Sequence, residues 1–377
     1  MCVLKLKKKK WVFLAIFTVL LFISIIPQNT RIEREKGRTN PKEAYFYQKL
    51  DRNRVQCDLC PRKCIIPSGS WGFCRARKNI DGILYSMGYA SPCAVHVDPI
   101  EKKPFNHFHP GTKALSIASA GCNMRCKFCQ NWEISQKNPT ETSNYNLKPE
   151  MVVNIAISKN TKSIAYTYSE PINFYEYMID TSRIAKRSGI RNVVHTNGFI
   201  NKEPLEKLCK FVDAFCVDLK GFTEEFYKKN TSANLKQVLE SLQIIKGNGV
   251  WLELVNLVIP SQNDSLEKIK EMSLWIKKNL GKNVPLTFSR FYPTHKLTNL
   301  PPTPVSTLEK AREIAVKAGL NYVYIGNVPG HKYEDTYCPN CGDKIIDRYG
   351  YHIVSNKIIE GRCKFCGYEI KGVWNEK

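Results

Sequence analysis

Three cysteines in one short segment are the residues of this chain best suited to redox chemistry. Cys122, Cys126 and Cys129 have the spacing C-x3-C-x2-C and follow an apolar run at residues 114–118. Three thiolates on one loop can hold three irons of a [4Fe–4S] cluster and leave the fourth iron open, whereas protein usually supplies four cysteines. An open iron can bind a small molecule and pass an electron to it. A zinc knot that lacks one ligand, or part of a disulfide framework, is the alternative.

Two further groups bring the clustered cysteines to eleven of the fifteen in the chain. Close C-x2-C pairs in a chain of 377 residues favour metal binding over disulfides. The first group combines four thiols with nearby glycines that permit tight turns, so it can ligate one metal centre. Zinc and a second iron–sulfur cluster both remain open for it, because spacing does not separate them. Its members are Cys57, Cys60, Cys64 and Cys74.

The second group lies near the end of the chain. Cys338 and Cys341, and then Cys363 and Cys366, form two C-x2-C-G knuckles on either side of a β-rich stretch at residues 349–359. Paired knuckles of this kind are typical of a zinc ribbon, in which four thiolates close a tetrahedral site. Metal binding offsets the chain entropy of such a short module. We therefore predict a structural zinc site here.

Between these groups the sequence alternates short apolar runs with amphipathic stretches. Buried-type strands that alternate with helices predict an α/β fold with a parallel sheet, in the form of a complete or partial (β/α) barrel. The predicted strands are 114–119, 163–168, 191–195, 213–218, 251–258, 285–290 and 321–325. The predicted helices are 149–159, 172–187, 203–210, 234–247, 265–279 and 305–318.

Polar residues follow the ends of several predicted strands. In (β/α) barrels the chemistry lies at the carboxyl ends of the strands, so we expect these side chains to gather at one rim. A zwitterionic ligand that carries a ribose and an adenine needs carboxylates for its amine and hydroxyls, and cations for its carboxylate. The candidate residues at this rim are Glu170, Asn197, Asp218, Lys220 and His295.

The cysteine segment, with Asn123 after the first cysteine and Phe128 before the last, resembles the radical S-adenosylmethionine (radical SAM) superfamily. Further segments resemble its pyruvate formate-lyase activating-enzyme branch, namely 122–135, 168–171, 196–198 and 218–220. Other segments resemble the radical SAM enzymes of the AmmeMemoRadiSam system, namely C-x-L-C-P-x-x-C at 57–64, P-I-E-K-K-P at 99–104, 129–132 and 289–291. The resemblance covers about residues 42–374.

This resemblance implies roles for the candidate residues. Cys122, Cys126 and Cys129 would hold the [4Fe–4S] cluster, and Glu170 would accept hydrogen bonds from the amine of SAM. The residues that would contact the rest of SAM are Asn197, Asp218, Lys220 and His295. Two positions depart from the pattern, because Ser169 stands where the family has Asn and His195 stands where a smaller residue is commoner. Glu170 as a carboxylate at a helix start, and a simple Asp218–Lys220 ion pair, are the structural alternatives.

The sequence divides into four predicted parts. Residues 1–40 form a hydrophobic anchor or signal with a linker, and 41–110 form a cysteine-rich cap that begins with a short helix at 45–50. Residues 111–327 form the radical SAM core, and 328–377 form the zinc-ribbon-like module. The apolar run at 11–26 is shorter than the about 20 residues of a spanning helix, but no small-x-small cleavage site follows it. We expect an uncleaved membrane anchor with the catalytic part in the cytoplasm.

The implied activity is that of an oxidoreductase. One electron from a low-potential donor would enter the cluster, SAM would split, and a 5'-deoxyadenosyl radical would abstract hydrogen from a protein or peptide substrate. Residues 133–150 contain no cysteine, so the chain lacks the ferredoxin-like insertion common in glycyl-radical activators. The resemblance also implies partners similar to AMMECR and Memo proteins.

The strongly basic composition supports a different class of function. Hydrophobic content is 43%, charged content is 24% and the net charge is +23. Such a charge permits binding to nucleic acid or anionic lipid, but the lysines are scattered and no arginine-and-aromatic stripe is present. A metal-bearing nucleic-acid-binding protein and a membrane-tethered scaffold without radical chemistry are therefore the alternatives.

Overall fold

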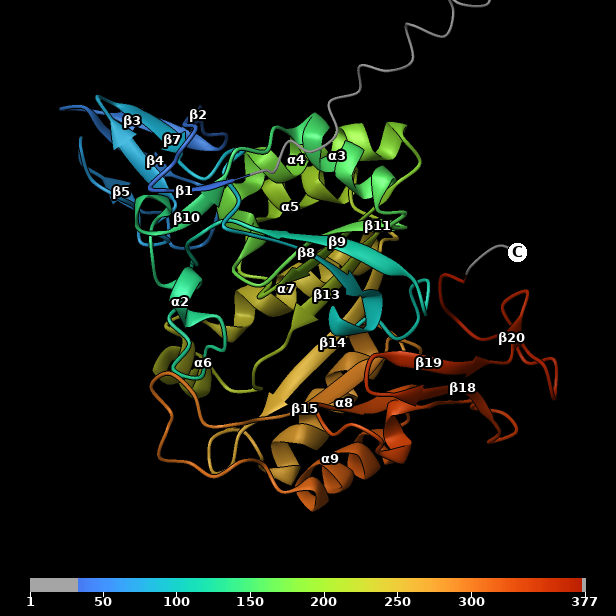
Figure 1. Cartoon of the computed structure of the whole chain (residues 1–377). Helices are drawn as coiled ribbons and strands as arrows, with labels where there is room; N and C mark the ends of the chain where they lie inside the picture. The colour runs from blue at the N-terminus through green and yellow to red at the C-terminus, as the bar shows by residue number, and fades with distance from the viewer. Residues whose placement is uncertain (1–32, 375–377) are drawn as a thin grey trace, which may run out of the picture. The chain divides into compact units, whose positions relative to one another are not determined.

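The computed structural model describes residues 33–374, and the chain from Arg34 onward forms one compact unit (Figure 1). The predicted hydrophobic segment at residues 11–26 lies outside the described residues. Within residues 33–374, no helix has both the length and the apolar character that crossing a membrane requires.

An eight-stranded sheet forms the centre of this unit. Seven of its strands are parallel and neighbour one another in chain order, and β8 pairs antiparallel with β9 at one edge. The strands are β8 (Ala94–Pro99), β9 (Lys113–Ala118), β11 (Ser163–Tyr166), β12 (Arg191–Thr196), β13 (Ala214–Asp218), β14 (Trp251–Val258), β15 (Leu286–Arg290) and β16 (Val323–Gly326). Each predicted strand overlaps one of the seven parallel strands, so the predicted α/β fold is confirmed. The sheet is open, because β8 and β16 are its edges in the described chain.

Helices connect successive parallel strands, as a parallel sheet requires. They are α2 (Trp132–Ser135), α3 (Pro149–Ser158), α4 (Tyr175–Arg187), α5 (Lys202–Cys209), α6 (Glu224–Thr231), α7 (Leu235–Gly247), α8 (Leu266–Asn279) and α9 (Val305–Lys317). The described residues also form short 3-10 segments, namely η1 (Ile100–Lys102), η2 (Pro139–Glu141), η3 (Pro171–Phe174) and η4 (Lys332–Glu334). The six predicted helices are present, with η3 as the first turn of the second. The helix α6 was not predicted from the sequence; it begins where the Thr223 hydroxyl accepts from the amide of Phe226.

The segment after β8 packs against one face of the sheet. Phe105 and Phe108 are fully buried against small and β-branched side chains of five parallel strands. This segment also places Lys103 at the wall of the cavity described below, where its ammonium donates to Asp98 at 2.7 Å. The chain before the first parallel strand therefore completes both the core and the site described below.

Short strands form the N-terminal part of the described chain, drawn in blue in Figure 1. They are β1 (Arg34–Lys36), β2 (Lys42–Glu43), β3 (Tyr47–Leu50), β4 (Arg54–Cys57), β5 (Ile65–Ile66), β6 (Arg77–Ile80) and β7 (Ile83–Ser86), with β1 paired to β10 (Ser143–Tyr145). The predicted helix at 45–50 is wrong, because Tyr47–Leu50 pairs antiparallel with β4. Its aromatic residues favour a strand. A buried ion pair of 2.7 Å between Arg77 and Glu176 ties this part to α4.

The C-terminal part is a set of small antiparallel pairings, drawn in red in Figure 1. Its strands are β17 (Thr336–Tyr337), β18 (Lys344–Tyr349), β19 (His352–Asn356), β20 (Ile358–Ile359) and β21 (Arg362–Cys363). Cys338, Cys363 and Ile345 share a buried cluster with Tyr322, which directly precedes β16, and with Tyr324 of β16. The division of the chain into cap, core and terminal module stays a prediction, although β8 of the predicted cap belongs to the central sheet.

Candidate active site

The cysteine loop begins directly after β9 and is held by the N-terminal cap. Gly121 has a φ of +102°, and a Cβ at this position would lie 2.6 Å from the carbonyl oxygen of Cys74. The amide of Cys122 donates to that same carbonyl at 3.1 Å. Only glycine permits this backbone angle together with so close an approach. The cap therefore fixes the first turn of the loop.

All three thiols of the loop line one cavity of about 390 Å³ at the carboxyl ends of the strands. Burial raises the pKa of the Cys122 thiol, and it raises the pKa of Cys126 to about 12. The Sγ of Cys129 lies 3.2 Å from the hydroxyl of Ser135. Thiols that face a shared cavity are suited to become thiolate ligands of iron, because the metal displaces their protons. The donor set therefore fits three corners of an iron–sulfur cluster.

Glu170 lines the same cavity and is almost fully buried. Its Oε1 accepts from the Thr196 hydroxyl at 2.6 Å and from the amide of Ile172, and its Oε2 accepts from the amide of Asn197 at 2.8 Å. Burial raises the pKa of Glu170 above its ordinary value, although these three donors oppose the shift. The carboxylate is thus a helix-start cap that also fixes the end of β12.

Asn197 connects that end of β12 to the cysteine loop. Its Nδ2 donates to the Oδ1 of Asn123 at 2.9 Å and points to the Sγ of Cys122 at 3.8 Å. Its Oδ1 accepts from the amide of Phe199 at 2.9 Å. The side chain is buried at the cavity wall, so it positions the loop that carries Cys122.

Three hydrogen-bonded residues, His195, Asp218 and Lys220, lie at the ends of β12 and β13. The Asp218 carboxylate accepts from Nε2 of His195 at 2.9 Å and from the ammonium of Lys220 at 2.8 Å. Burial opposes the charge of Asp218, but Lys220 and His195 together lower its pKa below the ordinary value. Burial also opposes the charge of Lys220, and Asp218 raises its pKa. Both partners are therefore ionised at neutral pH, and both line the cavity.

His295 lies near the cysteine loop, but it is not among the residues that line the cavity in the described chain. Its ring stacks on Trp132 at 5.5 Å with an interplanar angle of 16°. The next residue, Lys296, donates its amide to the carbonyl of Lys127. The loop after β15 therefore contacts the cysteine loop. The predicted contact of His295 with SAM stays a prediction.

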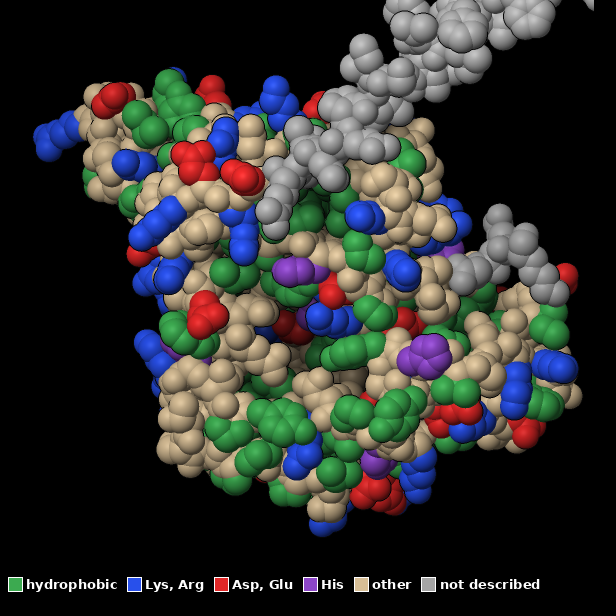
Figure 2. Space-filling view, viewed as in Figure 1, with side chains coloured by type: hydrophobic (Ala, Val, Ile, Leu, Met, Phe, Trp, Pro, Cys, Tyr) green, Lys and Arg blue, Asp and Glu red, His purple; other side chains and the backbone are tan. Residues whose placement is uncertain are grey.

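The cavity also has residues that the sequence analysis did not select. Lys102, Lys103 and Ser289 line it, and they belong to segments on which the family resemblance depends. Arg348 and Tyr351 come from the C-terminal part, and no sequence signal connected them with this site. Figure 2 shows a hollow in the middle of the described surface, with acidic and basic side chains inside and around it. The cavity is thus shared between the core and the C-terminal part.

The four N-terminal thiols surround a second, much smaller cavity. Cys57 ends β4, and its amide donates to the carbonyl of Cys64 at 2.9 Å. Cys60 lies in the turn between them, and Cys74 lies in the loop before β6. The structure therefore brings together the four cysteines that the sequence predicted to share one centre.

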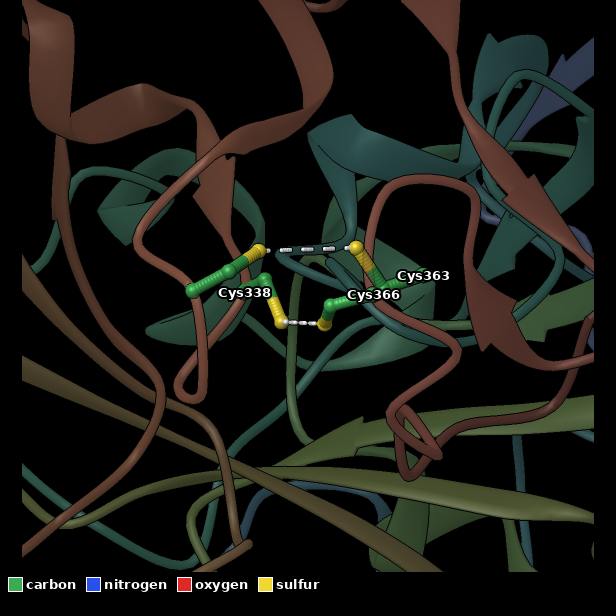
Figure 3. Close-up of side chains that lie close together, drawn as sticks. Cys338, Cys363 and Cys366 are labelled. Atoms are coloured by element: carbon green, nitrogen blue, oxygen red, sulfur yellow. Dashed lines mark hydrogen bonds between the residues drawn. The ribbon is translucent and has the colours of Figure 1, made fainter.

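The four C-terminal thiols form a tighter group. Figure 3 shows Cys338, Cys363 and Cys366 turned toward one another. The sulfur of Cys338 lies 3.6 Å from that of Cys366, and the sulfur of Cys341 lies 3.8 Å from that of Cys363. All four lie within 4.8 Å of one another. A single tetrahedral zinc with bonds of about 2.3 Å places its sulfurs about 3.8 Å apart, so this geometry suits one ion.

The chain is similar in sequence to a protein family, to curated proteins and to solved structures. Residues 116–273 match the model of the radical SAM superfamily. The uncharacterized protein MJ0808 of Methanocaldococcus jannaschii is 50% identical over 331 residues, which cover 87% of this chain and 98% of that protein. A pyruvate formate-lyase 1-activating enzyme of Escherichia coli K12 is 22% identical, over 56% of this chain and 91% of its own. A solved domain of a pyruvate-formate lyase-activating enzyme from Bacteroides vulgatus is 16% identical, with a TM-score of 0.39 over 44% of this chain and 99% of its own.

Proposed function

Because the chain belongs to the radical SAM superfamily, we propose that it cleaves SAM reductively at a [4Fe–4S] cluster held by Cys122, Cys126 and Cys129. We further propose that its substrate is a protein or peptide, from which a hydrogen atom is abstracted. When bound, the cluster supplies the electron that splits SAM into methionine and a 5'-deoxyadenosyl radical. The relatives named as activating enzymes support this substrate class.

One observation carries the proposal. Three thiols, of which that of Cys126 is buried, line the same cavity as an ionised Asp218–Lys220 pair, at the carboxyl ends of parallel strands. A structural metal site has no use for an open volume lined by opposite charges. A cluster with one open iron needs such a volume beside it, since its small-molecule ligand must bind there.

Asp218 and Lys220 are the groups best placed to hold a zwitterionic ligand. The ammonium of Lys220 uses one hydrogen on Asp218 and retains two for a carboxylate. Asp218 keeps lone pairs for hydroxyl groups after its bonds to His195 and Lys220. In this proposal Lys220 binds the carboxylate of SAM and Asp218 binds the ribose, while each keeps the other charged.

Glu170 and Asn197 have a mainly positioning role in this proposal. The Glu170 carboxylate has about four lone-pair sites, and three are engaged by Thr196, Ile172 and Asn197. One site remains for the amine of SAM, as the family resemblance implies. Asn197 keeps the loop of Cys122 in register through Asn123. His295 would act from outside the cavity, by supporting Trp132.

The substrate would enter at the end of the cavity formed with the C-terminal part. Lys102, Asn327 and Tyr351 line that region, and Arg348 bridges it to the core through a 2.8 Å bond to the carbonyl of Asn106. These side chains offer donors for backbone carbonyls of a peptide and an aromatic surface for its side chains. Closing this end around a bound peptide would exclude water from the radical.

Zinc at Cys338, Cys341, Cys363 and Cys366 completes the proposal, because it would hold the strands that present Arg348 and Tyr351. The proposed partners are a low-potential electron donor and, from the family resemblance, proteins similar to AMMECR and Memo.

The test is SAM cleavage by protein prepared and reconstituted without oxygen. With dithionite, the wild-type protein should convert SAM to 5'-deoxyadenosine, and Cys129→Ala should not. Cys209→Ala is the matched control, since this buried cysteine belongs to none of the three groups. Conversion that is equal in wild type and Cys129→Ala would refute the assigned ligands.

A further inference from the structure

The four N-terminal thiols lie next to the cysteine loop, which is called the catalytic loop from here on because its three thiols would hold the catalytic cluster. The carbonyl of Cys74 accepts the amide of Cys122 at 3.1 Å, so a single hydrogen bond joins a member of each group. The Nε of Arg62, which lies between Cys60 and Cys64 in sequence, donates to the carbonyl of Asn123 at 2.6 Å. Cys74 and Arg62 line the cavity between the N-terminal thiols, and both are hydrogen-bonded to the backbone of the loop that carries Cys122.

Two arginines lie in the boundary between these thiol groups. The guanidinium of Arg62 lies 3.5 Å from the centre of the Phe73 ring, and that of Arg125 lies 3.9 Å from it. Arg125 also donates to the carbonyl of Cys122 at 2.8 Å. Cations in this position balance negative charge on both sides, which two anionic clusters need and a neutral packing interface does not.

The spacing of the thiols separates two kinds of metal centre. Zinc bonds of about 2.3 Å place the sulfurs of a tetrahedral site about 3.8 Å apart, and the C-terminal four thiols match that spacing at 3.6 and 3.8 Å. In the part of the chain that the structure describes, that group alone has its sulfurs within 4.8 Å of one another. The N-terminal four surround a cavity at wider spacing, like the catalytic three. A cluster produces wider spacing because each thiolate binds a separate iron.

We propose that Cys57, Cys60, Cys64 and Cys74 hold a second iron–sulfur cluster that passes single electrons to the cluster at the catalytic loop. The donor is an external low-potential one-electron reductant, which loses one electron to the second cluster. That cluster returns to its oxidised state when the catalytic cluster takes the electron, and no proton or bond is exchanged. The transfer step rests on the proposed function, whereas the presence of the second cluster does not.

The surface beside the N-terminal thiols suits this role. Ile65 is 56% exposed next to Cys64, and Lys63 is exposed on its other side. An external donor that docks on this side approaches Cys64 without entering the catalytic cavity. Reduction and substrate binding can then occur from different sides of the protein.

The second cluster is tested first in protein that cannot assemble the catalytic cluster. The triple variant Cys122→Ala/Cys126→Ala/Cys129→Ala removes the ligands of the catalytic cluster and is reconstituted anaerobically with iron and sulfide. We expect it to retain iron and sulfide and to give a dithionite-reduced EPR signal that SAM does not change. Adding Cys60→Ser to the triple variant should abolish this signal, whereas adding Cys209→Ser should not. A triple variant that binds zinc but no iron would overturn the proposal.

Electron transfer is tested separately by rapid freezing after dithionite is added. The wild-type protein should develop the SAM-sensitive EPR signal of the catalytic cluster in a fast phase. Cys64→Ser should lose that phase while its catalytic cluster remains assembled, and Cys209→Ser should keep it. Equal reduction rates in all three proteins would exclude the transfer step. If wild-type protein fails to cleave SAM but the triple variant binds iron, the proposed function fails and the second cluster stands.

Discussion

The catalytic loop and the C-terminal knuckles both present closely spaced cysteines, yet they differ in what faces the sulfurs. The C-terminal thiols face one another, with Gly342 and Gly367 donating to the carbonyls of Cys338 and Cys363 at 2.9 Å in two equivalent turns. The loop thiols face an open cavity that holds Asp218 and Lys220. Four inward sulfurs complete a closed site, whereas three sulfurs beside a charged cavity leave room for a ligand. Cysteine spacing alone therefore distinguishes the two sites less well than their surroundings do.

The largest expected effect comes from exchanging one cysteine in each region. Cys126→Ala should lower SAM cleavage by at least about 100-fold, because changing groups that merely support a metal ligand already costs about 10–100-fold. It should leave zinc at the C-terminal site unchanged. Cys341→Ala should have the opposite result, with zinc lost and loop iron retained. Metal analysis and 5'-deoxyadenosine formation measure both, and loss of both metals in either variant would contradict the separation of the sites.

A smaller loss of SAM cleavage is expected when a substitution distorts the backbone of the catalytic loop than when it removes one of the three cysteine ligands. Gly121→Ala adds a Cβ 2.6 Å from the Cys74 carbonyl at a φ of +102°, which should cost about 1–3 kcal/mol of stability and reduce iron loading. Gly189→Ala is the matched control, because its φ is +73° but no atom lies within 4 Å of the added Cβ. Denaturant unfolding and iron analysis compare the two, and equal iron loading would show that the contact with Cys74 does not hold the loop.

Asp218→Asn should have a moderate effect on stability and on SAM binding, because it removes the negative charge that pairs with Lys220 in the cavity. Its bonds to Lys220 and His195 are charge-assisted, so their loss should cost about 1–2 kcal/mol at pH 7. SAM binding should weaken because Lys220 loses its partner. Isothermal titration and chemical denaturation measure these changes.

The stability lost in Asp218→Asn should also depend on pH. The folded-state pKa of Asp218 lies below its ordinary value, so the native state binds fewer protons than the unfolded state in acid. The contribution of this carboxylate is present above about pH 4 and declines as pH falls through the folded pKa. The difference in unfolding free energy between wild type and variant should therefore shrink in acid, and a difference that grows there would contradict the ion pairing.

The smallest effect is expected for His295→Ala. The side chain stacks on Trp132 outside the cavity, and partly exposed positions away from a site usually change stability by about 0.5 kcal/mol or less. SAM cleavage should stay within about twofold of wild type, since 1.36 kcal/mol corresponds to a factor of ten. A much larger loss in a steady-state assay would assign His295 a direct contact with SAM.

The strands and the cysteine groups could be predicted because both are local patterns. Buried runs such as β11 stand out from polar flanks, and C-x2-C pairs need no knowledge of the fold. The strand β3 was predicted as a helix because its strand conformation depends on hydrogen bonds to β4, and the residues of β3 alone do not reveal that pairing. Arg348 could not be placed at the cavity, since its bond to Asn106 spans 242 residues of sequence.

The most direct test of the central claim is the EPR spectrum of the catalytic cluster with and without SAM. Protein that carries Cys60→Ser, reconstituted anaerobically and reduced with dithionite, isolates the signal of the loop. If one iron is open beside Asp218 and Lys220, adding SAM should change this signal, and the change should disappear in Cys126→Ala. A reduced signal that SAM leaves unaltered would mean that no open iron exists at the loop.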